Sequence, residues 1–252
     1  MIFLFFLSFS FSFNTNEIKT EIKNGDPKWD FILFVLSYTG QFCYSTDCQL
    51  PQNTESIHPG FNIHGWWPNF FNDYPTYCNS NFTKTEVNEI VKNDSQLKKD
   101  LQYYWPSLSS NCPFFDYEYM KHGTCLENIY NDKNGVKEYA NAAMKILKEN
   151  DFWELFKQHG VIADGSTLYS KVWLEDIVAH KVGKRKAVEL RCSGSYLAEL
   201  MLCTRVEKET KHSPEIITCP ENMNLESNGD CPDLIKFGTF RNPGTDGNRC
   251  EY

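Results

Sequence analysis

Ten cysteines, an even number, are distributed along this chain of 252 residues. Disulfides form and persist in oxidising compartments and are rare in the cytosol. The sequence has no C-x-x-C pair and no H-E-x-x-H segment, so the cysteines and the six histidines give little support to a metal site. The cysteines therefore predict a disulfide-rich fold and no metal.

The amino-terminal sequence indicates the same compartment. Residues 1–13 are an apolar run of secretory-signal length, too short to span a bilayer. We predict a signal peptide over residues 1–16; an uncleaved interfacial anchor is the alternative, because no basic residue precedes the run. Sequons at Asn81 and Asn93 predict N-glycosylation. No later stretch is apolar enough to cross a membrane, so we expect a secreted protein or one in the endolysosomal or vacuolar lumen.

Apolar patterns typical of strands occupy residues 29–37, 61–64, 187–192, 196–205 and 215–219. After the second of these strands, Gly65 is expected to turn the chain and Pro68 to end the segment.

Helical patterns occupy residues 83–105, 114–123, 136–149, 152–159 and 166–180. Thr83 and Glu86 resemble a capping box at the start of the first helix. In the last helix, Leu168, Val172 and Val178 are expected to share a face. These patterns predict an α+β fold, with a central antiparallel sheet and helices packed beside it. We expect a single disulfide-rich domain over residues 17–252, with its core at about residues 29–240.

One stretch near the middle of the chain combines an acid, a cation and an imidazole. On a helix ending at Gly123, Glu118 lies one turn before His122, and Lys121 lies three residues after Glu118. An ordinary surface ion pair between Glu118 and Lys121 is the commoner outcome of such spacing. Cys125 follows closely and would anchor this end of the helix.

Earlier in the chain, the segment F-N-I-H-G-W-W-P places His64 at the end of a predicted strand. Taken together, this segment and E-Y-M-K-H-G-T-C resemble the two active-site segments of the ribonuclease T2 family of secreted acid ribonucleases, in the same order and separation. The resemblance extends over about residues 29–240.

The resemblance implies metal-independent cleavage of single-stranded RNA. A base takes the proton of the ribose 2′-hydroxyl, whose oxygen attacks phosphorus, and an acid protonates the departing 5′-oxygen. The resulting 2′,3′-cyclic phosphate is then hydrolysed to a 3′-phosphate. By resemblance, His122 is the base and His64 the acid, roles that exchange in the hydrolytic step. Lys121 would stabilise charge on the phosphorane oxygens, and Glu118 would orient His122 or hold Lys121 in place.

The resemblance implies that Trp67, Asn69 and Tyr74 bind the 5′-side base and that Phe114 binds the following base. Stacking on aromatic faces tolerates any base, so we expect broad base tolerance. Core packing is an equally good interpretation of Phe114.

Three residues depart from the usual family sequence. Tyr117 stands where many members have a third histidine; it keeps a hydrogen-bond donor but carries no positive charge, so we expect weaker substrate binding. Asn69 stands in place of Asp and leaves the base preference open. Trp66 stands in place of Leu and would reshape the pocket.

By analogy with the family, disulfides join Cys78 to Cys125, Cys192 to Cys231 and Cys203 to Cys219. The other four cysteines allow two arrangements. Either Cys43 pairs with Cys48 and Cys112 with Cys250, or Cys48 pairs with Cys112 and Cys43 with Cys250.

The net charge of −8 argues against a protein that holds nucleic acid on a basic surface, but not against one that binds a short stretch and releases it. We expect single-stranded RNA as substrate, no cofactor, and a monomer without an obligate protein partner. The alternative is a catalytically weakened family member that serves in storage or recognition, which Tyr117 favours and the other active-site residues oppose. A metal phosphodiesterase ranks last.

Overall fold

The protein is described here from a computed structural model, which covers residues 29–109, 112–221, 229–240, 243 and 250–252. The predicted signal peptide, residues 1–16, lies outside the described residues. No helix among the described residues is long and apolar enough to cross a membrane.

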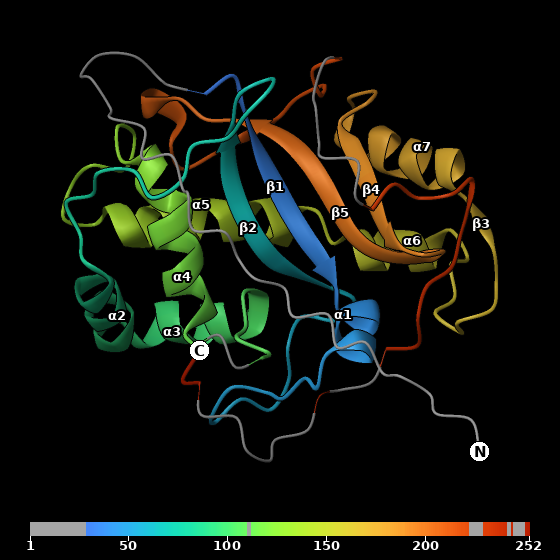
Figure 1. Cartoon of the computed structure of the whole chain (residues 1–252), viewed down its shortest axis with the longest axis horizontal. Coiled ribbons are helices and arrows are strands. Elements are labelled where there is room, and N and C mark those ends of the chain that lie inside the picture. The colour runs from blue at the N-terminus through green and yellow to red at the C-terminus, as the bar shows by residue number, and fades with distance from the viewer. Residues whose placement is uncertain (1–28, 110–111, 222–228, 241–242, 244–249) are drawn as a thin grey trace, which may run out of the picture.

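An antiparallel sheet forms the centre of the fold, with its strands in the order β2, β1, β5 and β4 and the short β6 paired to β5 (Figure 1). The strands are β1 (Phe31–Tyr38), β2 (Phe61–Asn69), β4 (Val188–Ser193), β5 (Tyr196–Arg205) and β6 (Glu215–Ile216). A separate pairing joins β3 (Tyr169–Ser170) to β7 (Leu234–Ile235). Strand β1 has a neighbour on each edge and is buried along most of its length, which explains its continuous apolar sequence.

Helices α5 and α6 cross behind the sheet, and α4 lies beside its β2 edge (Figure 1). The helices are α1 (Thr39–Ser45), α2 (Lys84–Asn93), α3 (Ser95–Tyr104), α4 (Phe114–Lys121), α5 (Gly135–Glu149), α6 (Phe152–Gln158) and α7 (Lys171–Val182). Two short 3₁₀ helices span Gly123–Leu126 and Lys208–Thr210. The α+β prediction is therefore confirmed.

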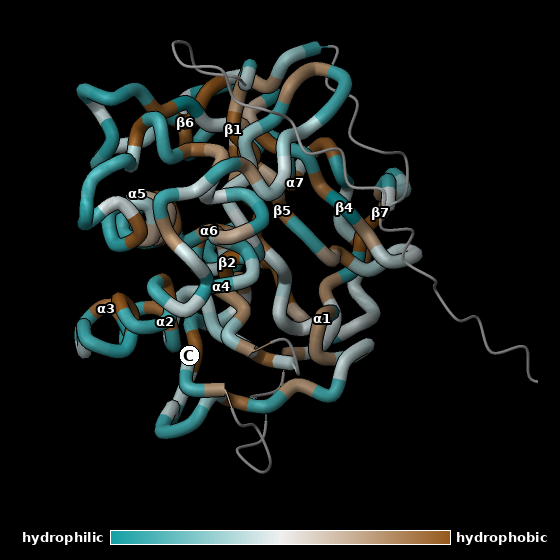
Figure 2. Tube along the Cα trace, turned by 60° about the vertical axis from the view of Figure 1, so that its left-hand side comes forward, coloured by the Kyte–Doolittle hydropathy of each residue, from teal (hydrophilic) through white to brown (hydrophobic). Residues whose placement is uncertain are grey.

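The two faces of the sheet are covered differently. Ile32, Phe34 and Leu36 of β1 point into the main core, which the helices complete. Alternate residues of the same strand point to the opposite face, where a smaller cluster contains Phe31, Leu33 and Val35. Figure 2 shows the apolar residues gathered along the central strands, with hydrophilic loops outside them. The smaller cluster leaves room on its face for polar side chains.

The predicted helix over residues 83–105 is in fact two helices. Asp94 ends α2 and caps α3, because its side chain accepts hydrogen bonds from the backbone N–H groups of Gln96 and Leu97. The capping box of Thr83 and Glu86 is present as predicted.

The predicted helix over residues 166–180 begins too early. Ser170 caps α7, and the residues before it pair with β7 instead. Leu168 and Val172 are 50 % and 63 % exposed, so the apolar face proposed for them is wrong. The face that α7 buries consists of Leu174, Ile177 and Val178.

Five disulfides cross-link the fold. Cys78 pairs with Cys125, Cys192 with Cys231, and Cys203 with Cys219. The open choice is resolved as Cys43 with Cys48 and Cys112 with Cys250. Typical cross-links of this kind contribute about 2–4 kcal/mol each to stability. The last three residues are held against the fold, and Tyr252 is fully buried.

Candidate active site

A β-bulge in β2 determines where the first histidine points. Val35 of β1 pairs with Gly65 and Leu36 pairs with Ile63, so His64 is an extra residue without a partner in β1. The expectation that Gly65 turns the chain and that Pro68 ends the segment is wrong, since β2 continues through both to Asn69.

The bulge also changes the face to which every later side chain of β2 points. Side chains alternate along a strand, so one extra residue reverses the alternation. As a result His64 and Trp67, three residues apart, lie on the same face as Val35, opposite the main core. Trp66 turns into the main core, where its indole N–H donates to Thr204 Oγ1 at 2.8 Å. Trp66 therefore does not reshape the site, contrary to expectation.

Gly65 makes space for this arrangement. A Cβ atom at this position would collide with the indole nitrogen of Trp67 and the carboxylate of Glu118. Trp67 Nε1 donates to Glu118 Oε2 at 2.7 Å, and this bond passes directly over the glycine backbone. Only glycine allows the strand, the indole and the carboxylate to approach so closely.

Helix α4 supplies the acidic and basic residues of the second motif. Its last turn contains Lys121, and His122 follows in a non-helical conformation at the start of the 3₁₀ helix. Two links hold this end in place: the Cys78–Cys125 disulfide, and a hydrogen bond from Tyr77 N–H to the Lys121 carbonyl at 2.8 Å. The helix end is thus fixed against the loop that follows β2.

Glu118 is 3 % exposed, and burial raises its pKa. The positive charge of His64, the bond from Trp67 and the charge of Lys121 oppose this rise in part. Within the part of the chain that the structure describes, no ion pair within 4.0 Å joins Glu118 to Lys121. Glu118 thus fixes Trp67 directly, a role that the sequence did not predict.

His122 is 4 % exposed and lies against the Trp67 ring, with ring centroids 5.1 Å apart. Its Nδ1 atom is buried and has no hydrogen-bond partner among the described residues. Burial, together with the charges of Lys121 and His64, holds the pKa of His122 well below its ordinary value of 6.5. This imidazole is therefore kept neutral.

His64 contacts the same indole, at a centroid distance of 4.9 Å, but its surroundings differ. Its Nδ1 lies 2.6 Å from Glu199 Oε1. Burial lowers the pKa of His64, but the hydrogen bond to Glu199 and the negative charges of Glu199 and Glu118 outweigh it, so the pKa is raised. This imidazole is therefore kept charged to a higher pH than usual.

Glu199, on β5, is the residue that the sequence analysis missed. The available signal was one acidic residue inside an otherwise apolar strand, L-A-E-L-M-L-C. Such a residue is costly to bury without a partner. Identifying that partner required the pairing of strands, because Glu199 and His64 are 135 positions apart.

The predicted base-binding residues are only partly brought together. Phe114 lies 5.6 Å from the His64 ring by centroids and lines a cavity of about 370 Å³ with His64 and Glu199. Trp67 forms the centre of the site, but the Asn69 amide donates to the Trp67 carbonyl within its own strand. Tyr74 is 47 % exposed in the loop after β2.

Lys121 and Tyr117 lie together on the exposed side of α4, with Lys121 Nζ 5.7 Å from the centre of the Tyr117 ring. This distance allows a cation–π interaction, which a histidine at position 117 would replace with charge repulsion at acidic pH. The sequon residues Asn81 and Asn93 are both exposed.

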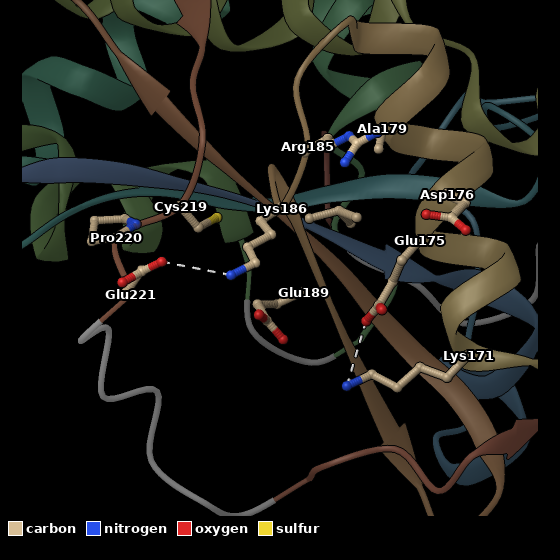
Figure 3. A pocket seen from close by; sticks show the side chains of 11 residues that line it. Lys171, Glu175, Asp176, Ala179, Arg185, Lys186, Glu189, Cys219, Pro220 and Glu221 are labelled. Carbon is tan, nitrogen blue, oxygen red and sulfur yellow. Dashed lines mark ion pairs between the residues drawn. The ribbon is translucent and has the colours of Figure 1, made fainter.

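Another pocket, of about 750 Å³, lies between α7 and β4 and includes none of the predicted site residues (Figure 3). Four of its charged side chains pair with one another, in the bridges Lys171–Glu175 at 3.4 Å and Lys186–Glu221 at 3.6 Å. Among the described residues, no group of three or more His, Cys, Asp or Glu side chains is arranged to hold a metal.

Known proteins resemble this chain over most of its length. The model of the Ribonuclease T2 family matches residues 29–219. Ribonuclease 3 of Arabidopsis thaliana is 30 % identical over 225 residues, covering 84 % of this chain and 90 % of that protein. Extracellular ribonuclease LE of Solanum lycopersicum is 24 % identical and covers 87 % and 91 %. The crystal structure of RNase NT in complex with 5′-AMP has the same fold, with a TM-score of 0.65, 22 % identity and coverage of 84 % and 100 %.

Proposed function

The chain belongs to the ribonuclease T2 family, and from this premise we propose that it is a metal-independent endoribonuclease of single-stranded RNA. It cleaves by transesterification to 2′,3′-cyclic phosphate ends, which it then hydrolyses to 3′-phosphates. The observation that carries this proposal is that both imidazoles lie against one indole while their surroundings displace the pKa of His64 upward and the pKa of His122 downward.

The opposite pKa displacements support the assignment of roles. A base must be neutral before it acts and an acid must be protonated, so two groups with separated pKa values suit the two tasks. His122 takes the 2′-hydroxyl proton, and its buried Nδ1 leaves Nε2 as the nitrogen that meets the substrate. His64 gives its proton to the departing 5′-oxygen.

The other site residues stabilise the charge of the transition state or position the groups around it. Lys121 supplies a fixed positive charge beside the phosphorane oxygens. Glu118 holds the Trp67 indole, against which both imidazoles rest. Trp67 and Phe114 are the aromatic side chains proposed to stack on bases, and Asn69, Tyr74 and Tyr117 stay as the further proposed substrate contacts.

The pH dependence follows from the two pKa displacements. The raised pKa of His64 means that the acid is lost only as the pH rises above the ordinary range of histidine. The lowered pKa of His122 means that the base is lost only as the pH falls well below it. The enzyme is therefore active across mildly acidic pH, which suits the secretory or lumenal destination that we propose.

The direct test is to incubate the purified, disulfide-intact protein with RNA from pH 4 to pH 8 in the presence of a chelator. We expect cleavage with cyclic phosphate ends appearing first and 3′-phosphates later. Activity that the chelator abolishes would contradict the metal-independent mechanism. A lack of cleavage at every pH would favour a storage or recognition role instead.

A further inference from the structure

We propose that Glu199 is a positioning residue for His64: it holds the imidazole by Nδ1 and presents Nε2 to the departing oxygen of the substrate. This role rests on the proposed function, because it concerns the residue assigned there as the acid. The two atoms lie 2.6 Å apart, and the two side chains are 32 % and 22 % exposed. The contact is thus short and shielded from most of the solvent.

The strand pairing places Glu199 within reach of His64 across β1. Ser37 of β1 pairs with Asn62 on one side and with Glu199 on the other, so these three side chains lie in a row on one face. His64 follows Asn62 by two residues and lies on the same face. Because serine is small, the glutamate side chain can extend over β1 to the imidazole.

A carboxylate on one ring nitrogen determines what the other nitrogen does. Neutral imidazole has one N–H, and a carboxylate accepts it, which fixes the proton on Nδ1. Protonation then occurs at Nε2, and the resulting imidazolium is stabilised by the adjacent negative charge. A histidine held in this way is oriented and charged for proton donation, which is the task of the acid.

The charges around His64 come from three elements. Glu199 belongs to β5 and accepts its hydrogen bond, whereas Glu118 and Lys121 belong to α4 and act through space with opposite signs. The neighbouring His122 is held neutral. Arg191 of β4 is the cross-strand neighbour of Glu199 in the strand register, so a third element contributes a charged residue to this part of the sheet. Glu199 is thus the negative group that is both bonded to His64 and held by the sheet.

A cavity of about 370 Å³ lies beside His64 and Glu199, so a substrate can reach their hydrogen bond. Ser37, His64, Phe114 and Glu199 all line it. The hydrogen bond is therefore at the wall of a cavity whose volume falls within the range of small-molecule sites, about 300–1,000 Å³, and not in the packed core.

Glu199→Gln tests the role. Glutamine keeps the size and the oxygen acceptor but removes the charge, so His64 should lose its proton at lower pH. We expect the alkaline limb of kcat/KM to move down by about one pH unit. We also expect kcat at mildly acidic pH to fall about tenfold with little change in KM, and Glu199→Asp to restore part of the shift. Glu189→Gln, on β4 and facing the other pocket, is the matched control and should leave the profile unchanged.

Thermal unfolding of each variant shows whether the variant is folded. A folding defect lowers the amount of active enzyme at every pH, whereas a positioning defect moves the pH profile of kcat/KM in the enzyme that is folded. A wild-type alkaline limb in folded Glu199→Gln would overturn the role of Glu199. If His64→Ala in the same assay abolishes cleavage, the proposed function survives that result. If His64→Ala remains fully active, the proposed function itself fails.

Discussion

The two imidazoles of the site contact one indole from opposite kinds of surroundings. His64 lies at a bulge on a strand, partly open to a cavity, and is bonded to a carboxylate. His122 lies at a helix end, almost fully buried, with a cation next to it in sequence and an Nδ1 atom that finds no hydrogen-bond partner in the part of the chain that the structure describes. The same chemical group is thus driven in two directions by what surrounds it. In the mechanism that we propose, environment, and not residue type, separates the acid from the base.

The largest expected effect comes from removing either ring. His64→Ala and His122→Ala should each lower kcat/KM for RNA by about 10³-fold or more, because each removes one of two proton transfers. Initial rates on an RNA dinucleotide measure the loss. His180→Ala, on the exposed part of α7, is the control and should retain full activity. Near-normal turnover in either site variant would remove that residue from the mechanism.

Gly65→Ala should displace the indole that both imidazoles contact. The added methyl displaces Trp67 from Glu118, so both imidazoles lose the surface they share. We expect an activity loss of about 100-fold and a lower melting temperature, since overpacking costs about 1–3 kcal/mol. Gly160→Ala adds backbone strain at φ +82° but meets no atom within 4 Å, so it should lose stability without losing activity per folded molecule. Equal activity in the two variants would contradict this account of Gly65.

Glu118→Gln should affect one histidine more than the other. Glutamine still accepts the Trp67 hydrogen bond, but the negative charge near His64 is lost, which lowers the pKa of His64. The alkaline limb of kcat/KM should move to lower pH, by less than in Glu199→Gln because Glu118 does not bond to the ring. Profiles of the two variants measured side by side check the order, and a larger shift for Glu118→Gln would reverse it.

Tyr117→His has the smallest expected effect and acts on substrate binding. A histidine beside Lys121 adds a second charge for phosphate at acidic pH, so KM should fall severalfold while kcat changes less. Steady-state kinetics at acidic and neutral pH measure both constants, and the gain should disappear at neutral pH. A rise in kcat with KM unchanged would count against a binding role for this position.

Local spacing points to half of this candidate site. Glu118, Lys121 and His122 occur within five residues at the end of one helix, and β1 is a continuous apolar run, so both features are visible in the sequence alone. The family resemblance added His64 and Trp67. These features depend on neighbours in the chain, which a sequence displays directly.

The rest depends on register between distant strands. Nothing in β2 shows that His64 is bulged, because the extra residue is defined only by its pairing with β1. The contact between Glu199 and His64 depends in turn on that bulge and on the pairing of β1 with β5. The pairing of Cys112 with Cys250 likewise requires the carboxyl terminus to return to α4, which the spacing of cysteines does not reveal.

Titration of the six histidines by NMR tests the central contrast most directly, with His64→Ala and His122→Ala used to assign the two site resonances. The account predicts that His64 titrates above 6.5 and His122 well below it in the intact, RNA-free protein. If both rings titrate together near 6.5, or if His122 titrates above His64, the two surroundings do not separate the acid from the base.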